Sequence, residues 1–179
     1  EKHHSLEDYL SSIEIEISIK EDDASQIPRI TELTQKTNQF NLTTKRYTEN
    51  QIETFINSLT DKVFSVNVKD KFGESGLTAV IIVNENNQIA NIDSFIMSCR
   101  IMGRNIEMAI MNYLIAYFRN RGFKEVIGTY FPTIKNKPVL TFYEKSGFKL
   151  LKEENENKYY NVLTLDYLDQ EVEYIKIKN

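Results

Sequence analysis

A short glycine-containing stretch, Arg100-Ile-Met-Gly-Arg-Asn105, constrains the fold more than any other part of the sequence. Before it, residues Ile89–Met97 are rich in β-branched and aromatic types over the length of a strand. After it, apolar residues recur at helical spacing from Ile106 up to Gly122, and a glycine often follows the last turn of a helix. The sequence therefore predicts a strand, a tight turn and a long helix in succession.

A turn of this kind directs several free backbone N–H groups and the positive end of the helix dipole toward one point. Phosphate-type anions bind at such points, and two arginine side chains add further donors. We therefore expect the phosphate part of a ligand to be held by Arg100, Ile101, Met102, Gly103, Arg104 and Asn105. The alternative is an ordinary strand–helix connection in which the glycine only relieves backbone strain.

Size and composition exclude several classes of protein. With 179 residues, 41% of them hydrophobic, the chain can bury one substantial core. No apolar run reaches the ~20 residues that span a bilayer, and the N-terminus lacks a secretory signal pattern. Cys99 has no disulfide partner, and His3 and His4 alone do not make a metal-ligand cluster. We expect a cytoplasmic protein without a bound metal.

The net charge of −4 hides an asymmetry along the chain. Residues 95–150 contain nine Lys and Arg against three Asp and Glu, a local balance of +6, and this segment includes the glycine turn. A solvated helix face could produce part of the excess. There is no basic arm, recognition motif or high pI, so nucleic acid is not an expected partner. A small phosphorylated ligand or an acidic protein fits better.

The order of predicted elements indicates one α+β domain with a mixed sheet, because strands and helices do not alternate strictly. We divide the chain into a linker or leading helix (residues 1–10), the domain itself (11–168) and a tail or added edge strand (169–179). The predicted elements are a helical turn at 3–9, a strand at 13–19, helices at 24–37 and 48–59, strands at 63–68, 77–83 and 89–97, a helix at 106–122, a strand at 126–130, a short helix at 138–146, and strands at 148–151 and 159–165.

A second group of residues follows the strand at 126–130: Asn136 and Tyr143 are seven apart, and Gly147-Phe148 comes next. With the earlier turn, this resembles the GNAT superfamily of N-acetyltransferases. Its acyl-CoA site pairs a Gln/Arg-x-x-Gly-x-Gly/Ala loop with an Asn…Tyr-x-x-x-Gly-Phe segment. The resemblance implies the acyl-CoA N-acyltransferase fold, a central mixed and mostly antiparallel sheet flanked by helices. Asn105 departs from the Gly or Ala of that motif, and Val139 stands where a small residue is common.

The resemblance also implies roles for three side chains. Tyr143 would be the general acid that protonates the leaving thiolate; the alternative is a tyrosine buried for its ring. Asn136 would bind the pantetheine amide; the alternative is a helix N-cap. Asp93 lies where some acetyltransferases place a general base; the alternative is a solvent-facing strand residue. The implied cofactor is a thioester of CoA or of phosphopantetheine.

The block Gln35–Tyr47, together with residues 97–104 and 132–136, resembles the C-terminal region of FkbH-like proteins. In those proteins a haloacid-dehalogenase (HAD) domain precedes a GNAT-like domain, and the family loads a glyceryl unit onto an acyl carrier protein, toward methoxymalonyl extender units. The HAD motif Asp-x-Asp-x-Thr is absent here, so the chain resembles the GNAT-like half alone, consistent with its first residue not being Met. The implied partners are an acyl carrier protein and the HAD-like domain; no nucleic acid and no membrane are expected.

The polar residues of this block are either ligand-facing or form a turn network among themselves. The resemblance favours a substrate-binding role for Asn38, Asn41, Thr43 and Thr44. Arg46 could contact a phosphate or a carrier protein; the alternative is a solvated surface charge. Two functions stay open: an acyltransferase, or a non-catalytic module that docks a carrier protein for a HAD domain. The transferase requires one pocket, where amides at the start of the long helix meet Asn136 and Tyr143. If the protein's own atoms fill that pocket, only the scaffold assignment remains.

Overall fold

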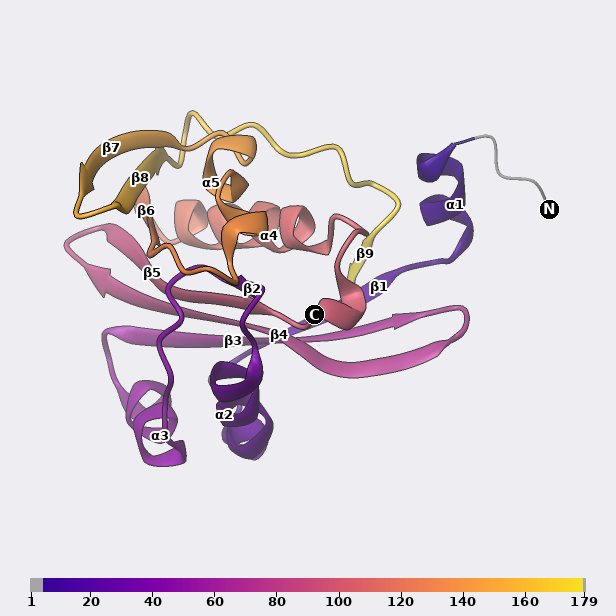
Figure 1. Cartoon of the computed structure of the whole chain (residues 1–179), viewed down its shortest axis with the longest axis horizontal. Helices are drawn as coiled ribbons and strands as arrows, with labels where there is room; N and C mark the ends of the chain where they lie inside the picture. The colour runs from indigo at the N-terminus through magenta and orange to yellow at the C-terminus, as the bar shows by residue number, and fades with distance from the viewer. Residues whose placement is uncertain (1–4, 179) are drawn as a thin grey trace.

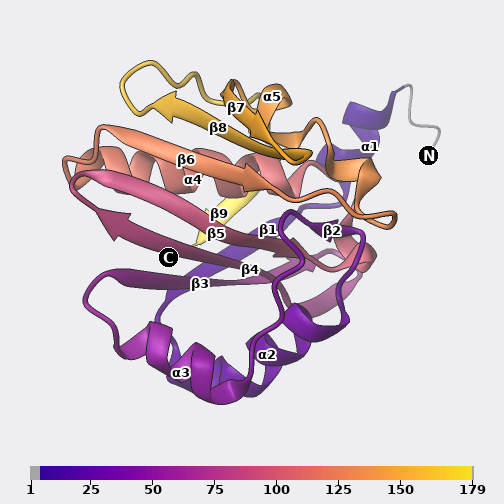
Figure 2. The same cartoon turned by 60° about the vertical axis from the view of Figure 1, so that its left-hand side comes forward.

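The computed structural model describes residues 5–178, which form one sheet with helices on both of its faces (Figures 1 and 2). The order along the sheet is β7-β8-β6-β5-β4-β3-β1-β9, and the short β2 pairs with β5. The strands are β1 (Glu16–Glu21), β2 (Phe40–Asn41), β3 (Asp61–Asp70), β4 (Gly73–Asn86), β5 (Ile89–Met97), β6 (Glu125–Tyr130), β7 (Lys149–Glu154), β8 (Asn157–Leu163) and β9 (Lys176–Lys178).

The helices divide between the two faces. Figure 1 shows α4 and α5 above the sheet and α2 and α3 below it, while α1 lies near the N-terminus. Three short 3₁₀ helices complete the described chain. The bounds are α1 (Leu6–Ser12), η1 (Ala24–Gln26), α2 (Ile27–Lys36), α3 (Glu49–Asn57), η2 (Cys99–Ile101), α4 (Ile106–Asn120), η3 (Lys137–Val139) and α5 (Phe142–Lys145).

Hydrophobic periodicity explains this division. On α2, Ile30 and Leu33 face the sheet and join a smaller core with Ile52 of α3. Helix α3 begins at the predicted capping box: the Thr48 side chain accepts from Gln51 N, and the Gln51 side chain accepts from Thr48 N. The larger core lies between the other face of the sheet and α4 and α5. Helices α4 and α5 therefore cover one face of the sheet, and α2 and α3 cover the other.

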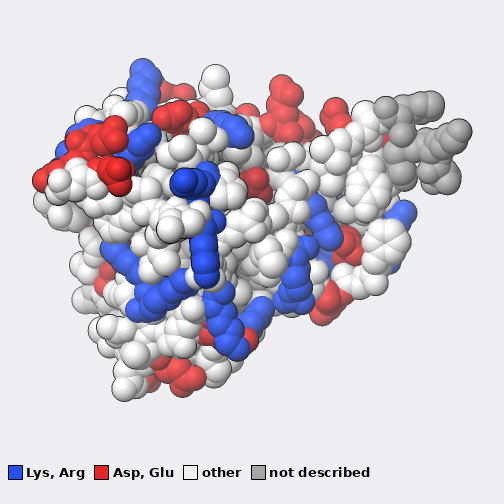
Figure 3. Space-filling model, in the orientation of Figure 1, with Lys and Arg blue, Asp and Glu red and all other residues white. Residues whose placement is uncertain are grey.

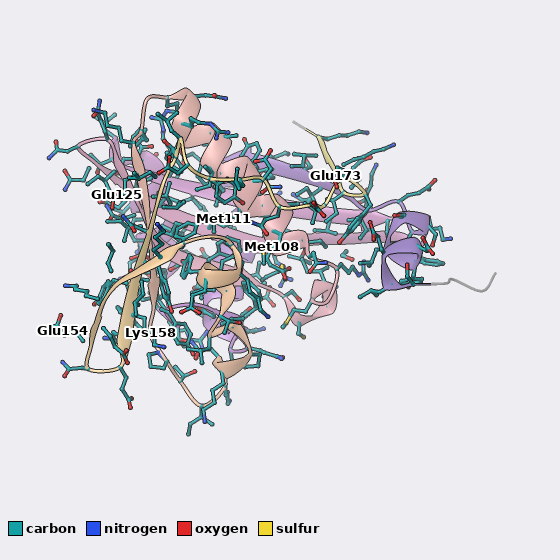
Figure 4. All side chains as sticks on the ribbon, turned by 90° about the horizontal axis from the view of Figure 1, so that it is seen from above. Met108, Met111, Glu125, Glu154, Lys158 and Glu173 are labelled. Carbon is teal, nitrogen blue, oxygen red and sulfur yellow. The ribbon has the colours of Figure 1, made fainter. Side chains whose placement is uncertain are left out.

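The predicted fold class is confirmed, since neighbouring strands are antiparallel except for β5–β6 and β1–β9, which are parallel. Near the end of the chain, β9 pairs with the outer edge of β1. Seen from above, that tail, with Glu173 on it, crosses over α4, which carries Met108 and Met111 (Figure 4). The leading helix is found at α1; His3 and His4 lie outside the described residues.

Two predicted elements differ from the structure, and one strand was not predicted. The turn expected at residues 70–76 is much shorter, because β3 and β4 continue through two bulges and pair as far as Asp70 and Gly73. The helix expected at residues 138–146 is broken into η3 and α5. Strand β2 was not expected at all, and it lies in the region where the ligand pocket was predicted.

Candidate functional site

The site lies at a fork where β5 and β6 stop pairing. The two parallel strands are paired from Ile89 with Glu125 to Ile92 with Gly128, and no further. The next residue, Asp93, is a β-bulge: Ile82 pairs with Ser94 and Val83 with Ile92, which leaves Asp93 without a partner on β4. Asn136 and Tyr143, the two residues of the pocket that the sequence resemblance implied, contact β6 and the residue just beyond it at this fork.

In this protein its own chain occupies the fork. We call Phe40–Thr43 the sealing segment. Phe40 and Asn41 form β2, antiparallel to Met97 and Ile96 of β5. Leu42 then bridges both arms: its N–H donates to Phe95 O (3.3 Å), and its carbonyl accepts from Phe131 N (2.8 Å), just beyond the end of β6. The main chain of this segment satisfies the strand edge that a pantetheine amide would otherwise use.

The sealing segment is part of the core rather than a loop laid over it. Phe40, Asn41, Leu42 and Thr43 are all buried, with Asn41 fully inaccessible. The Phe40 ring packs edge-on against Phe142 of α5 at 5.4 Å between centroids and tilted against Phe95 at 5.8 Å. The Thr43 hydroxyl donates to the carbonyl of Asp93 at the bulge (2.9 Å). The segment thus touches the sheet, α5 and the bulge at once.

Asn136 binds the sealing segment instead of a ligand. Its amide nitrogen donates to Asn41 O and Phe131 O, both at 2.9 Å. Its amide oxygen accepts from Thr133 N (2.7 Å) and from the Tyr130 hydroxyl (3.1 Å). The residue is fully buried. All of the amide's usual hydrogen-bonding capacity is therefore used within the protein.

The polar residues around the sealing segment form hydrogen bonds with one another. This is the turn network predicted from the sequence as the alternative to ligand binding for the Gln35–Tyr47 block. The Arg46 guanidinium donates to Thr34 O and Thr37 O at the end of α2, both at 2.6 Å, and to the Asn38 side chain. The Asn41 side chain donates to Thr37 O (3.2 Å) and accepts from Thr44 N (2.9 Å). The Thr44 hydroxyl is buried without a partner among the described residues.

Asp93 does not face solvent freely. Its carboxylate accepts from Lys45 Nζ (2.6 Å), the Tyr47 hydroxyl (2.5 Å) and Ser94 Oγ (2.9 Å). Burial raises the pKa of Tyr47, and its hydrogen bond to Asp93 raises that pKa further. All three donors come from the protein itself, so a substrate amine would have to displace one of them before Asp93 could act as a general base.

Tyr143 is fully enclosed at the fork. It is 1% exposed, and its hydroxyl has no hydrogen-bond partner among residues 5–178. Burial raises the pKa of this hydroxyl. The ring lies on Gly128 so closely that a Cβ there would come within 2.2 Å of Tyr143 Cε1. The main chain of Thr129 lies close enough to oppose part of this rise in pKa.

The predicted strand–turn–helix is present at residues 98–105. Gly103 has φ +82° and Asn105 has φ +60°, so both lie in the left-handed region, and α4 begins directly after them. Asparagine tolerates this conformation better than most residues, which explains how it replaces the Gly or Ala of the GNAT motif. Its side chain turns outward to the Tyr174 hydroxyl of the tail (3.0 Å).

Side chains of the protein also engage the turn where a phosphate would bind. Arg104 forms an ion pair with Asp70 (2.8 Å), and Arg100 donates to Ser75 O (3.3 Å). Tyr174 donates to Arg104 O (3.0 Å). Glu107 lies in the first turn of α4, and burial raises its carboxyl pKa. Ile101 is fully buried and Met102 partly so, which makes both of them core residues.

An acyl thioester of CoA does not fit this arrangement. The strand edge at the fork and the Asn136 amide already form hydrogen bonds within the protein, and Arg104 at the turn is already paired with Asp70. Exposing Phe40 and Leu42 would cost about 1.5–3 kcal/mol each, before any hydrogen bond is lost. A free-energy cost of about 1.4 kcal/mol lowers affinity tenfold. Exposing both side chains, at a total of about 5 kcal/mol, would therefore weaken binding of the thioester by more than ~10³-fold.

Several residues of the site were not found from the sequence: Asp70, Glu107 and Tyr174 at the turn, and Tyr47 at the bulge. Asp70, Tyr174 and Tyr47 each contact a predicted residue far along the chain, so no local pattern indicates them. Glu107 lies in the first turn of a predicted helix and had only that local position to indicate it. Among residues 5–178, no group of three or more His, Cys, Asp or Glu could hold a metal ion. None of the helices in that range is long and apolar enough to cross a membrane.

Comparison with known proteins agrees with the geometry of the scaffold. A family model described as an acetyltransferase (GNAT) domain matches residues 17–168. A ribosomal-protein-S18-alanine N-acetyltransferase from Escherichia coli is similar in structure, with a TM-score of 0.64, 12% identity, and coverage of 87% of this chain and 97% of that one. A spermidine N-acetyltransferase from Vibrio cholerae, solved with CoA and spermine, is also similar. Its TM-score is 0.65 at 15% identity, and the match covers 84% of this chain and 97% of that one. No curated protein matches the sequence.

Proposed function

Because this chain belongs to the GNAT acetyltransferase domain family, we propose that it is a GNAT-type acyltransferase domain whose thioester cleft is closed, and that it docks a partner protein. Membership of a fold family does not fix the chemistry of a particular member. The observation that carries the proposal is Leu42, whose backbone bonds to both arms of the fork, at Phe95 O and Phe131 N. A core strand in that place leaves no room for the arm of a thioester.

The identity of the partner protein is inferred from the sequence resemblance to FkbH-like proteins. The block that resembles FkbH-like proteins, Gln35–Tyr47, is the block that contains the sealing segment. In this proposal an acyl carrier protein binds the outside of the domain, and a neighbouring HAD-like domain performs the chemistry of a glyceryl or methoxymalonyl extender unit. The phosphopantetheine arm of the carrier stays outside the fork.

Calorimetry tests the proposal with two pairs of ligands. CoA and acetyl-CoA should give no binding heat at ligand concentrations up to about 1 mM, because the fork is closed. Acyl carrier protein should bind equally well in its apo form and in its holo form, since the arm is not inserted. Low-micromolar binding of acetyl-CoA, or holo carrier binding more than tenfold tighter than apo, would contradict the closed cleft. Carrier protein that fails to bind in either form would contradict the docking role.

A second candidate is acyl transfer, and one observation favours it. The buried Tyr143 hydroxyl has no partner among the described residues and lies at the fork, where a GNAT acid is expected. This function requires the sealing segment to withdraw. Steady-state assays with acetyl-CoA and spermidine, the amine in the name of one structural neighbour, should then show turnover that Tyr143→Phe lowers by ~10²-fold or more. Absence of turnover in the wild-type domain removes this candidate.

A further inference from the structure

Cationic side chains surround the sealing segment on the outside of the molecule. They come from four parts of the chain: α2, the residues after the segment, the turn at η2, and the loop 131–137 that contacts the segment through Asn136. Figure 3 shows Lys and Arg gathered in a band across this face. We call this set the basic band; its members are Arg29, Lys36, Lys45, Arg46, Arg100, Lys135 and Lys137.

The band keeps most of its charge. Glu32 forms ion pairs with Arg29 and Lys36, and Asp93 forms one with Lys45. Seven cations against these two carboxylates leave an excess of five positive charges, on a chain whose net charge is −4. The rest of the surface is therefore clearly acidic, and a negatively charged partner is steered toward this one face.

An apolar side chain projects from the same face. Ile134 is 90% exposed and directly precedes Lys135. The loop that carries it is rigid, because Thr133 N donates to the Asn136 side chain (2.7 Å) and Asn136 N donates to the Thr133 hydroxyl (3.1 Å). A fixed, exposed isoleucine next to lysines has the form of an apolar anchor with a charged rim.

We infer that the basic band and Ile134 form the docking surface for the acidic face of a carrier-type protein, with Ile134 entering an apolar socket on that partner. This inference rests on the proposed function and adds the surface at which it operates. The cations spread over four segments instead of converging on one point, which suits an extended protein surface and not a small anion. The cations that line the neighbouring hollow of about 330 Å³ are Arg29 and Lys36, and both already form ion pairs with Glu32.

Nucleic acid fits this face less well. The pI of the chain is about 5.4, whereas a nucleic-acid-binding domain is expected to lie above ~9. A phosphate backbone also makes its contacts with charged and polar groups, so an exposed isoleucine would not contribute to binding it. The exposed apolar side chain of Ile134 therefore favours a protein partner over a polyanion such as nucleic acid.

The test uses the whole chain and apo acyl carrier protein, with calorimetry at 150 mM salt. Ile134→Ser removes the anchor, and the double variant Lys135→Glu/Lys137→Glu reverses charge on the rim. The matched control is Lys124→Glu/Lys149→Glu, which makes the same charge change at exposed lysines outside the band. We expect each test variant to weaken binding by tenfold or more and the control to stay within twofold of the wild type. Circular dichroism should show that all the variants fold.

Three other outcomes overturn the inference. Carrier binding that neither test variant weakens would leave the docking role intact but place it on another surface. Binding weakened equally by the control would mean that net charge alone is responsible. Tight binding of a single-stranded oligonucleotide, lost in the lysine variant and unaffected by Ile134→Ser, would make the face a general polyanion site.

Discussion

Replacing Leu42 with alanine tests whether the sealing segment belongs to the core. Leu42 is 1% exposed and lies between the two arms of the fork. Buried Leu→Ala changes cost about 2–5 kcal/mol, depending on how far the cavity collapses. For a chain of this length, about 2–4 °C of Tm is lost per 1 kcal/mol. We therefore expect Tm to fall by roughly 5–15 °C, while the hydrogen bonds of the Leu42 backbone remain possible.

The matched control is Leu59→Ala, because Leu59 is 95% exposed and the change removes the same atoms. It should change the free energy of unfolding by less than about 0.5 kcal/mol. Urea unfolding followed by circular dichroism measures both variants, and an unchanged m-value shows that the denatured state is comparable. If Leu42→Ala lowers the free energy of unfolding no more than the control does, residues 40–43 are a surface loop outside the core, and the fork is open to a ligand.

Three further substitutions probe the same region, each followed by urea unfolding. Asn136→Ala should cost about 2–4 kcal/mol, because it leaves Asn41 O and Thr133 N buried without partners; a cost under 0.5 kcal/mol would show that Asn136 does not close the loop. Glu107→Gln should stabilise the protein at pH 7.5 and not at pH 3.5, because a carboxyl whose folded pKa is raised loses stability as pH rises above its unfolded pKa of about 4.3; an equal gain at both pH values would contradict this sign. Gly128→Ala should prevent stable folding unless it is paired with Tyr143→Ala, since the new Cβ would lie 2.2 Å from the Tyr143 ring; a stable single variant would mean that the ring is free to move.

The sequence was sufficient for the scaffold because local periodicity determines it. The alternation in Ile13–Ile19, the helical repeat after Ile106 and the capping box at Thr48 each depend on neighbours within a few positions. The turn at Gly103 was found for the same reason. These local signals, with the spacing of Asn136 and Tyr143, led to the GNAT fold that the structure and the family match support.

The contents of the fork could not be predicted, because they depend on pairs distant in sequence. Phe40 pairs with Met97, and Lys45 and Tyr47 reach Asp93 across more than forty residues. A strand of two residues inside a polar run carries no periodicity. Glu107 was not singled out from the sequence, since an acidic residue in the first turn of a helix ordinarily complements the dipole. Local chemistry therefore indicated an open anion site, and only tertiary contacts close it.

Amide hydrogen exchange at Leu42 and Phe131 tests the closed fork most directly. Both N–H groups form the hydrogen bonds that join the sealing segment to the two arms of the fork: Leu42 N donates to Phe95 O, and Phe131 N donates to Leu42 O. We expect both to exchange only with global unfolding, at the same protection as core amides of β5, and to be unaffected by millimolar acetyl-CoA. Exchange of either amide within seconds, or a selective change in their protection on adding acetyl-CoA, would show that the segment opens and that the fork admits the thioester.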